Sequence, residues 1–222
     1  MIKQNLLSVR TTIPDQVKLV CVSKFHPEES ILEAYQAGER IFGESKVQEL
    51  CSKKEKLPTD IQWHFIGHLQ TNKVKFIVPF VSLIHGVDSI RLLQEINKQA
   101  NKNQLVVNCL LQVHIATEET KFGFSASEVL ELLQTGTLQE FNNVSIRGLM
   151  GMATFTDNTQ QVRKEFSHLR QLFDSIQKMK LPLLPEFDTL SMGMSDDYPI
   201  AIEEGSTMVR IGSRIFGQRI YS

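Results

Sequence analysis

Continuous apolar runs alternate along this chain with segments whose apolar residues recur at helical spacing. Several of the runs are apolar throughout, which is typical of strands that are buried on both faces of a parallel sheet. We expect eight strands, at residues 18–24, 40–44, 61–67, 81–87, 105–115, 146–152, 187–192 and 208–216.

The segments between these strands carry signals of helix starts and ends. Pro27, followed by two glutamates, predicts the start of one helix, because acidic groups are favourable near the positive end of a helix. Gly38 predicts where that helix stops. The longest predicted helix covers about residues 159–180, whose apolar residues are spaced three and four apart. Further helices are expected at about residues 1–12, at 71–78 before Pro79, at 90–99 after a Ser89 cap, at 128–134 after Ser125 or Ser127, and at 198–204.

Eight strand–helix units in series predict a single (β/α)₈ barrel domain over residues 1–222, preceded by an extra N-terminal helix. The alternative is a doubly wound open sheet. That fold usually has a glycine-rich turn after its first strand, whereas the turn here reads SKFHPEES.

Composition narrows the class of protein without naming a function. The chain is 41% apolar and 22% charged with a net charge of −1, so we expect no general attraction to nucleic acid or to an anionic membrane. Neither a membrane-spanning apolar run nor the apolar centre of a signal peptide is present in the sequence. Three distant cysteines without a CxxC motif indicate a reducing compartment, and they disfavour a disulfide framework and a zinc site. We therefore expect a cytoplasmic protein with no bound metal.

Lys24 is the first candidate for chemistry, because it closes the apolar run KLVCVSK. A lysine is rarely buried without a partner, but at the mouth of a strand its amine can form a Schiff base with a carbonyl compound.

Two loops near the end of the chain predict a phosphate site. In a (β/α)₈ barrel, the loops after the seventh and eighth strands often bind phosphate through backbone N–H groups. Those loops read SMGMSDD and RIGSRIFG, which supply Ser191, Gly193, Ser195, Gly212 and Ser213. Each loop by itself is more often explained by turn glycines and capping serines. Their joint position after these two strands favours phosphate binding.

Arg210 lies inside the last apolar run, where the ordinary interpretation is a buried salt bridge. The alternative rests on arginine being a donor that stays protonated. Placed against a pyridine nitrogen, it would keep that nitrogen unprotonated, so that the ring would stabilise a carbanion poorly.

Motifs along nearly the whole chain resemble those of the pyridoxal phosphate (PLP) homeostasis protein family, which is similar to the barrel domain of alanine racemase, a fold-type III PLP enzyme. The matching segments are VSKFHP, IFGESKVQE, WHFIGHLQTNK, IHGVDS, KFGF, IRGLMGM and FDTLSMGMSDDYPIAIEEGSTMVRIGSRIFG.

The resemblance implies PLP as the cofactor, Lys24 as the Schiff-base lysine and Arg210 as the partner of the pyridine nitrogen. It also implies a phosphate site at Ser191, Gly212 and Ser213, with Met192 and Gly193 in the same loop, and a pocket lined by His64 and Met152. The family usually has Gly-Glu-Asn on the second strand, where this chain has Gly43-Glu44-Ser45. Ser45 therefore stands where an asparagine would contact the cofactor, and a water can fill the space left by its shorter side chain.

Two of the residues in these motifs keep an alternative interpretation. A histidine on a strand, such as His64, is more often a satisfied core residue than a catalyst. Lys121 in KFGF can receive transiently released cofactor, or it can be an exposed loop lysine.

Two functions of different classes compete. The first is a non-catalytic carrier that holds PLP on Lys24, exchanges it and supplies it to PLP-dependent apo-enzymes. The second is an amino-acid racemase or decarboxylase. Racemisation on this fold type uses a tyrosine from a C-terminal β-domain, whereas this sequence ends soon after the last strand, and Tyr35, Tyr198 and Tyr221 are poor replacements. We therefore expect a carrier that acts as a monomer without catalytic residues; a role as a regulatory docking surface is a third, weaker alternative.

Overall fold

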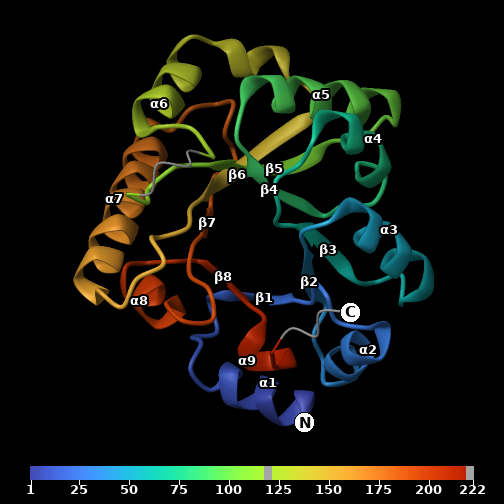
Figure 1. The fold of residues 1–222 in the computed structure, drawn as a ribbon. Helices are drawn as coiled ribbons and strands as arrows, with labels where there is room; N and C mark the ends of the chain where they lie inside the picture. Colours follow the sequence, from blue (N-terminus) through green and yellow to red (C-terminus); the bar gives the residue numbers. More distant parts are fainter. Residues whose placement is uncertain (118–121, 219–222) are drawn as a thin grey trace.

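The computed structural model describes residues 1–117 and 122–218 of the chain, and its strands form one closed parallel barrel (Figure 1). β1 pairs with β2 on one side and with β8 on the other, which closes the sheet and excludes the doubly wound alternative. The strands are β1 (Lys18–Val22), β2 (Ile41–Glu44), β3 (Gln62–Phe65), β4 (Leu83–Val87), β5 (Val107–Gln112), β6 (Val144–Met150), β7 (Thr189–Ser191) and β8 (Met208–Ile211).

Helices surround the barrel, and most of them lie where the sequence predicts them (Figure 1). They are α1 (Ile2–Arg10), α2 (Glu28–Gln36), α3 (Val47–Lys56), α4 (Val74–Ile77), α5 (Ile90–Lys102), α6 (Ala126–Gln134), α7 (Thr159–Met179), α8 (Tyr198–Glu203) and α9 (Ser213–Phe216), with short 3₁₀ turns η1 (Thr71–Lys73) and η2 (Thr137–Glu140). Ser89 caps α5 as expected. Of the two serines considered for α6, Ser125 is the cap, and it forms a capping box with Glu128.

Two elements differ from the sequence-based expectation. The last strand ends at Ile211, because the chain turns at Gly212 and residues 213–216 form α9 instead of continuing the strand. The apolar pattern of the sequence also did not predict α3. Three lysines and one glutamate in the second half of this helix make its helical spacing of apolar residues weak. Its buried positions Val47, Leu50 and Lys53 nevertheless recur at intervals of three residues.

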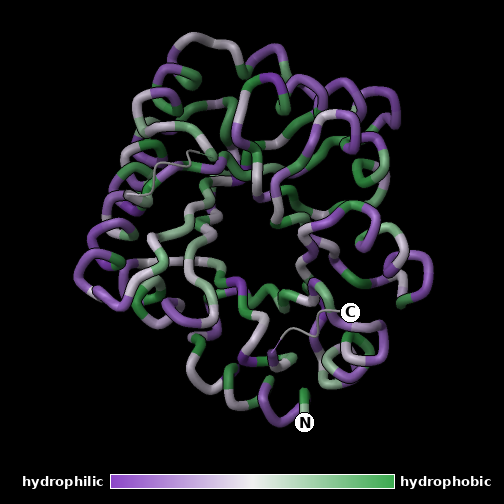
Figure 2. The backbone as a smooth tube through the Cα atoms, viewed as in Figure 1, coloured by the Kyte–Doolittle hydropathy of each residue, from purple (hydrophilic) through white to green (hydrophobic). Residues whose placement is uncertain are grey.

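Side chains on each strand alternate between the barrel interior and the layer under the helices. A small apolar cluster fills the interior, formed by Val20, Leu83, Leu110, Met150 and Met208. The much larger cluster lies between the strands and the helices and contains the buried cysteines Cys21 and Cys109. Figure 2 shows the hydrophobic positions along the ring of strands and hydrophilic positions recurring along the surrounding helices.

One glycine on β6 allows a close approach between neighbouring strands. Gly148 has φ of 153°, and a Cβ atom there would lie 1.7 Å from the carbonyl oxygen of Thr189 on β7. The β6–β7 pairing therefore requires a residue without a side chain at this position.

The extra N-terminal helix expected from the sequence packs beside α9 and α2 (Figure 1). The Asn5 side chain of α1 donates to the carbonyl oxygen of Ile215 on α9 at 3.1 Å. Among the described helices, none has the length and apolar character needed to cross a membrane.

Candidate functional site

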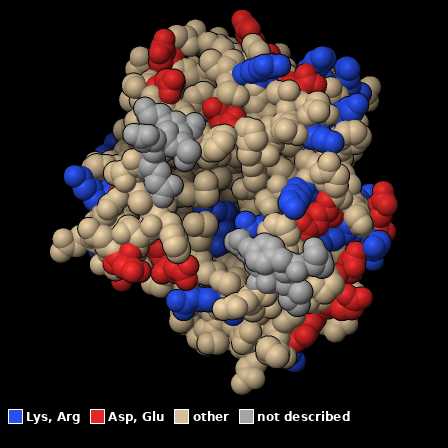
Figure 3. Space-filling view, viewed as in Figure 1, with Lys and Arg blue, Asp and Glu red and all other residues tan. Residues whose placement is uncertain are grey.

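A cavity of about 270 Å³ lies at the carboxyl ends of the barrel strands. It brings together residues at or after the ends of β1, β3, β6, β7 and β8: Val22, Lys24, His26, Ile66, Met152, Phe155, Met194, Ser195, Asp196, Arg210, Gly212, Ser213 and Gly217. In Figure 3 the molecular surface is hollowed at the centre of the visible face, and Lys and Arg side chains lie inside the hollow. In barrels of this architecture, the carboxyl ends of the strands are where active sites form.

Lys24 enters this cavity from the turn that follows β1. Lys18, Val20 and Val22 precede it at intervals of two residues, so Lys24 continues the inward-facing side of the strand. It is half-buried, and the next residue, Phe25, has φ of 67°. A left-handed backbone is uncommon for an aromatic residue, so surrounding contacts must hold this turn in place.

Arg210 reaches the same cavity from β8 and is only 3% exposed. Its guanidinium donates to the Ser191 carbonyl oxygen at 2.9 Å, to Ser191 Oγ at 2.6 Å and to the Gly151 carbonyl oxygen at 3.1 Å. Within residues 1–117 and 122–218, no carboxylate lies within ion-pair distance of it, so the salt-bridge interpretation fails there. Burial lowers the pKa of Arg210 to about 10, and the charge of Asp197 acts in the opposite direction.

Two buried histidines extend the hydrogen bonds of Arg210 through the barrel interior. Ser191 Oγ lies 3.0 Å from His85 Nδ1, and His85 Nε2 lies 3.0 Å from His64 Nδ1. Arg210 can only donate, so Ser191 Oγ accepts a hydrogen bond from it. The directions of the Ser191–His85 and His85–His64 hydrogen bonds depend on the tautomers of the two rings, and one consistent set has Ser191 donating to His85 Nδ1 and His85 Nε2–H donating to His64 Nδ1. Burial lowers the pKa of His64 to about 3 and that of His85 well below its ordinary value, which keeps both rings neutral.

The loops after β7 and β8 contribute hydroxyl and backbone donors to one side of the cavity. Ser195 Oγ accepts a hydrogen bond from the backbone N–H of Gly212 at 3.3 Å, which ties the two loops together. A Cβ atom at residue 212 would lie 3.0 Å from the Val22 carbonyl oxygen, so glycine keeps this approach open. Asp196 also lines the cavity, and its carboxylate, which is exposed, is the one unfavourable charge for a phosphate there.

Half of the ten cofactor-binding residues named from the sequence line this cavity, namely Lys24, Met152, Arg210, Gly212 and Ser213. Ser45 follows β2 at the same end of the barrel and is half-buried, but it does not line the cavity.

Four other residues named from the sequence do not line this cavity. Ser191 is fully buried behind Arg210 and is not exposed in the loop. Met192 faces the helix layer, because it follows the inward-facing Ser191 and successive strand residues point to opposite sides. Gly193, with φ of 97°, allows close packing of the strand end on α8, where a Cβ atom would lie 2.6 Å from Ala201.

His64 is the fourth of these residues. It faces the barrel interior one layer below the cavity, and it lines a separate cavity of about 410 Å³ that also contacts Lys18 and Gln62. Ile66, two residues further along the same side, takes the expected place near the strand end. The core-histidine interpretation therefore describes His64 better than the pocket-wall interpretation.

Two histidines that were not named from the sequence contribute to the site. His26 lines the cavity and stacks on Phe216, with ring centroids 5.2 Å apart. His85 was visible in the IHGVDS motif, but only the tertiary structure shows its bond to Ser191. Lys121 and Tyr221 lie outside the described residues.

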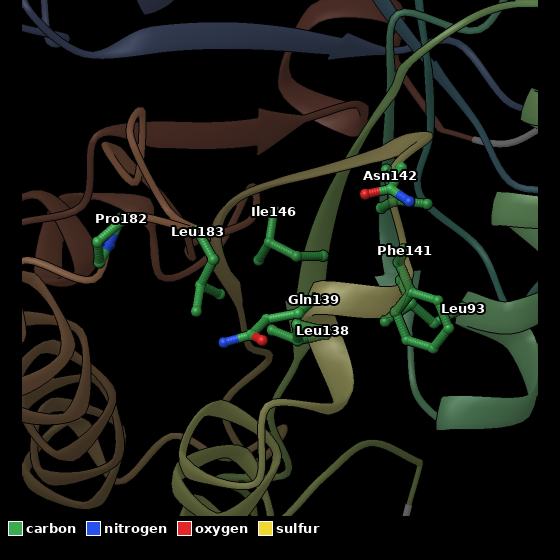
Figure 4. Close-up of a pocket in the computed structure, with 9 residues that line it drawn as sticks. Leu93, Leu138, Gln139, Phe141, Asn142, Ile146, Pro182 and Leu183 are labelled. Carbon is green, nitrogen blue, oxygen red and sulfur yellow. The ribbon is translucent and has the colours of Figure 1, made fainter.

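A larger cavity of about 520 Å³ lies elsewhere, near the amino ends of β6 and β7 (Figure 4). Its lining residues are Leu93, Leu138, Gln139, Phe141, Asn142, Val144, Ile146, Pro182 and Leu183. None of them is charged, so this cavity offers no group for covalent or phosphate chemistry.

Comparison with known proteins places this barrel in a family. A sequence model of the family described as alanine racemase, N-terminal domain, matches residues 1–220. The pyridoxal phosphate homeostasis protein of Aquifex aeolicus is 45% identical over 205 residues, which cover 92% of this chain and 88% of that protein. The protein of the same name from Escherichia coli is 37% identical, and the match covers 100% of this chain and 98% of that protein.

Solved structures agree with this comparison. PipY of Synechococcus elongatus PCC7942 without PLP superposes with a TM-score of 0.91 at 36% identity, covering 98% of this chain and 100% of PipY. The PLP-bound structure of PipY gives a TM-score of 0.88 at 35% identity, with the same coverage. An alanine racemase from Clostridium difficile shares the fold at 13% identity, with a TM-score of 0.76 and a match to 56% of that chain.

The fold and the position of the cavity thus define a barrel of the alanine racemase N-terminal class. With relatives at 37–45% identity over nearly their whole length, the chain belongs to the pyridoxal phosphate homeostasis protein family.

Proposed function

We propose that this protein binds PLP in the cavity at the carboxyl ends of the strands and holds it reversibly on Lys24 for intracellular PLP homeostasis. The observation that carries the proposal is that Lys24 and Arg210 line one cavity together with the serines of the last two loops. The names of the curated relatives and the PLP-bound structure of PipY support it.

The residues present fit this cofactor. When PLP is bound, its aldehyde condenses with a primary amine, with loss of water. Lys24 supplies that amine, and the hydroxyl groups of Ser195 and Ser213 supply donors suited to a phosphate. Arg210 offers only N–H donors, so a ring nitrogen facing it acts as an acceptor and stays unprotonated. Such a ring accepts negative charge weakly, which suits storage better than carbanion chemistry.

The described tyrosines support a carrier over a racemase. Racemisation needs an acid or base on the face opposite the lysine. The Tyr198 hydroxyl lies 2.7 Å from Thr12 Oγ1, and the Tyr35 hydroxyl donates to Asp60 on the protein surface. Neither of them lines the cavity. The cavity wall also includes the exposed side chains of Met152 and Phe155, so bound cofactor would be accessible for transfer.

The finer points of the proposal are a single barrel domain that acts as a monomer in the cytoplasm and passes PLP to apo-enzymes. Size-exclusion chromatography with light scattering tests the monomer. Incubation of the PLP-loaded protein with a PLP-dependent apo-enzyme, followed by the activity that this enzyme regains, tests transfer.

The first experiment is the visible absorbance of the protein mixed with PLP, before and after borohydride reduction, with mass mapping of the adduct. We expect a reduced adduct on Lys24 in the wild type, its loss in Lys24→Ala, and its retention in a Lys75→Ala control on an exposed lysine of α4. An adduct that persists in Lys24→Ala would move the role to another lysine, with Lys121 tested first. No adduct with any variant would refute the proposal.

The alternative function is a PLP-dependent racemase or decarboxylase. Incubation of the loaded protein with D- and L-amino acids separates the two, since a carrier leaves the chirality and the carboxylate of the amino acids unchanged. Turnover above that of free PLP would favour the enzyme.

A further inference from the structure

A buried cluster of three charged residues lies behind the turn that carries Lys24. Glu44 ends β2, and Glu49 and Lys53 lie one helical turn apart on α3. The Lys53 side chain is 5% exposed, that of Glu44 is 0% and that of Glu49 is 21%. None of these residues lines the cavity, so PLP binding alone does not explain why the fold buries them.

Among the described residues, the Lys53 ammonium group forms three hydrogen bonds, which are directed at this cluster and at the turn. Its nitrogen lies 2.8 Å from the Ser23 carbonyl oxygen, 2.7 Å from Glu44 Oε1 and 2.7 Å from Glu49 Oε1. These three acceptors use all three N–H donors of the lysine.

The same acidic groups also hold the two chain neighbours of Lys24. Ser23 Oγ donates to Glu44 Oε1 at 2.6 Å, and the backbone N–H of Phe25 donates to Glu49 Oε1 at 2.7 Å. Phe25 is the residue in the left-handed conformation, with φ of 67°. An unfavourable backbone conformation persists only where surrounding contacts impose it, and the Glu49 carboxylate is such a contact.

The burial of the Glu44 carboxylate is energetically unfavourable. Its Oε2 atom is buried and has no hydrogen-bond partner in the structure. Burial, only partly offset by Lys53, raises the pKa of Glu44 to about 7. Replacement of a buried ion pair by apolar side chains is often neutral or stabilising, so stability alone does not explain why charged residues occupy these positions.

We propose that Glu44, Glu49 and Lys53 are positioning residues, which fix the turn between Ser23 and Phe25 so that the Lys24 amine is directed into the cavity. The inference rests on the proposed function, because it concerns the reactivity of Lys24 toward an aldehyde. It adds that part of the site is built outside the barrel, in the layer between β2 and α3.

The test compares two ligands. PLP can condense with Lys24, whereas pyridoxamine 5′-phosphate has the same ring and phosphate but no aldehyde. In Lys53→Met and Glu49→Ala we expect the rate constant of covalent adduct formation with PLP to fall by about ten- to a hundred-fold, the range seen when a reacting group is misplaced. The affinity for pyridoxamine 5′-phosphate should stay within about two-fold of wild type, because the cavity itself is intact.

Matched controls come from the same helix. Lys54→Met and Glu55→Ala alter exposed residues of α3 and should leave both ligands unaffected. Glu49→Gln keeps an acceptor oxygen for Phe25 and Lys53, so it should recover most of the rate lost in Glu49→Ala. If Lys53→Met does not fold, the comparison of Glu49→Ala with Glu49→Gln tests the proposal without it.

The outcomes separate the two proposals. The positioning role would be overturned if Glu49→Ala lowered the rate constant with PLP and the affinity for pyridoxamine 5′-phosphate by the same factor. It would also be overturned if neither Lys53→Met nor Glu49→Ala lowered the rate constant with PLP. Absence of any PLP adduct in the wild type would refute the proposed function instead.

Discussion

Replacement of His64 by glutamine should change how the stability of the protein depends on pH. His64 is 4% exposed, and burial lowers its pKa from 6.5 to about 3. In the unfolded chain the ordinary value returns, so below pH 6.5 the unfolded state binds a proton that the folded state does not. The neutral ring therefore contributes stability that is fully present above pH 6.5 and is lost as the pH falls toward 3.

The size of this effect follows from the same shift. A pH of about 5 is roughly 1.5 units below the ordinary pKa of histidine. At about 1.36 kcal/mol per unit, the free energy of unfolding therefore falls by about 2 kcal/mol. Glu44 acts in the opposite direction, because its pKa is raised to about 7 and the folded state keeps its proton between pH 4.5 and 7. The pH dependence of the wild type alone mixes these contributions, whereas the difference between wild type and variant isolates His64.

The assay is urea unfolding at about pH 7.5 and about pH 5, with the free energy of unfolding obtained by linear extrapolation. The only tryptophan, Trp63, is buried beside His64 on β3 and reports the transition by fluorescence. Glutamine keeps an acceptor for the proton that His85 donates.

We expect His64→Gln to gain about 2 kcal/mol relative to wild type when the pH is lowered between these two values. The control is His168→Gln on α7, an exposed site, which should show no such change. If the difference between His64→Gln and wild type is the same at both pH values, His64 is not a neutral buried histidine.

Three further predictions concern the site and the barrel. Arg210→Gln should weaken PLP binding or shift the absorbance of the bound cofactor in a titration, and no change in either would mean that the ring does not face this residue. Ser45→Asn should leave the affinity for PLP unchanged or raise it, and a marked loss on titration would show that the end of β2 is arranged differently. Gly148→Ala should prevent folding or sharply lower the thermal midpoint measured by circular dichroism, because its Cβ atom would overlap the Thr189 carbonyl. Gly38→Ala, which meets no atom within 4 Å, should cost much less, and equal losses would contradict the steric argument.

The pattern of apolar runs was sufficient to predict the eight strands and the closed barrel, because strands buried on both faces differ in composition from amphipathic helices. Local rules also predicted the cap at Ser89 and limited the cap of α6 to Ser125 or Ser127, because the hydrogen bonds of a cap involve only neighbouring residues. Lys24 and Arg210 were found from the same local signals, as polar groups inside apolar strands where a polar side chain needs a specific reason.

The sequence did not determine how high each residue sits along the barrel axis. Alternation tells which side chains face inward, but the level of His64 relative to Lys24 depends on the pairing register of β1, β2 and β3, which barrel closure sets. His64 therefore lines the lower cavity, and Ile66, two residues further along β3, lies at the level of the Lys24 cavity.

The burial of the cluster behind Lys24 was likewise decided by tertiary structure. In the sequence, Glu49 and Lys53 form an ordinary pair four residues apart, of the kind that usually lies on a helix surface. Only the packing of α3 against the ends of β1 and β2 removes them from water and directs them at Ser23 and Phe25. A local pattern can specify which residues form an ion pair, but the solvent that surrounds the pair depends on elements far away in the chain.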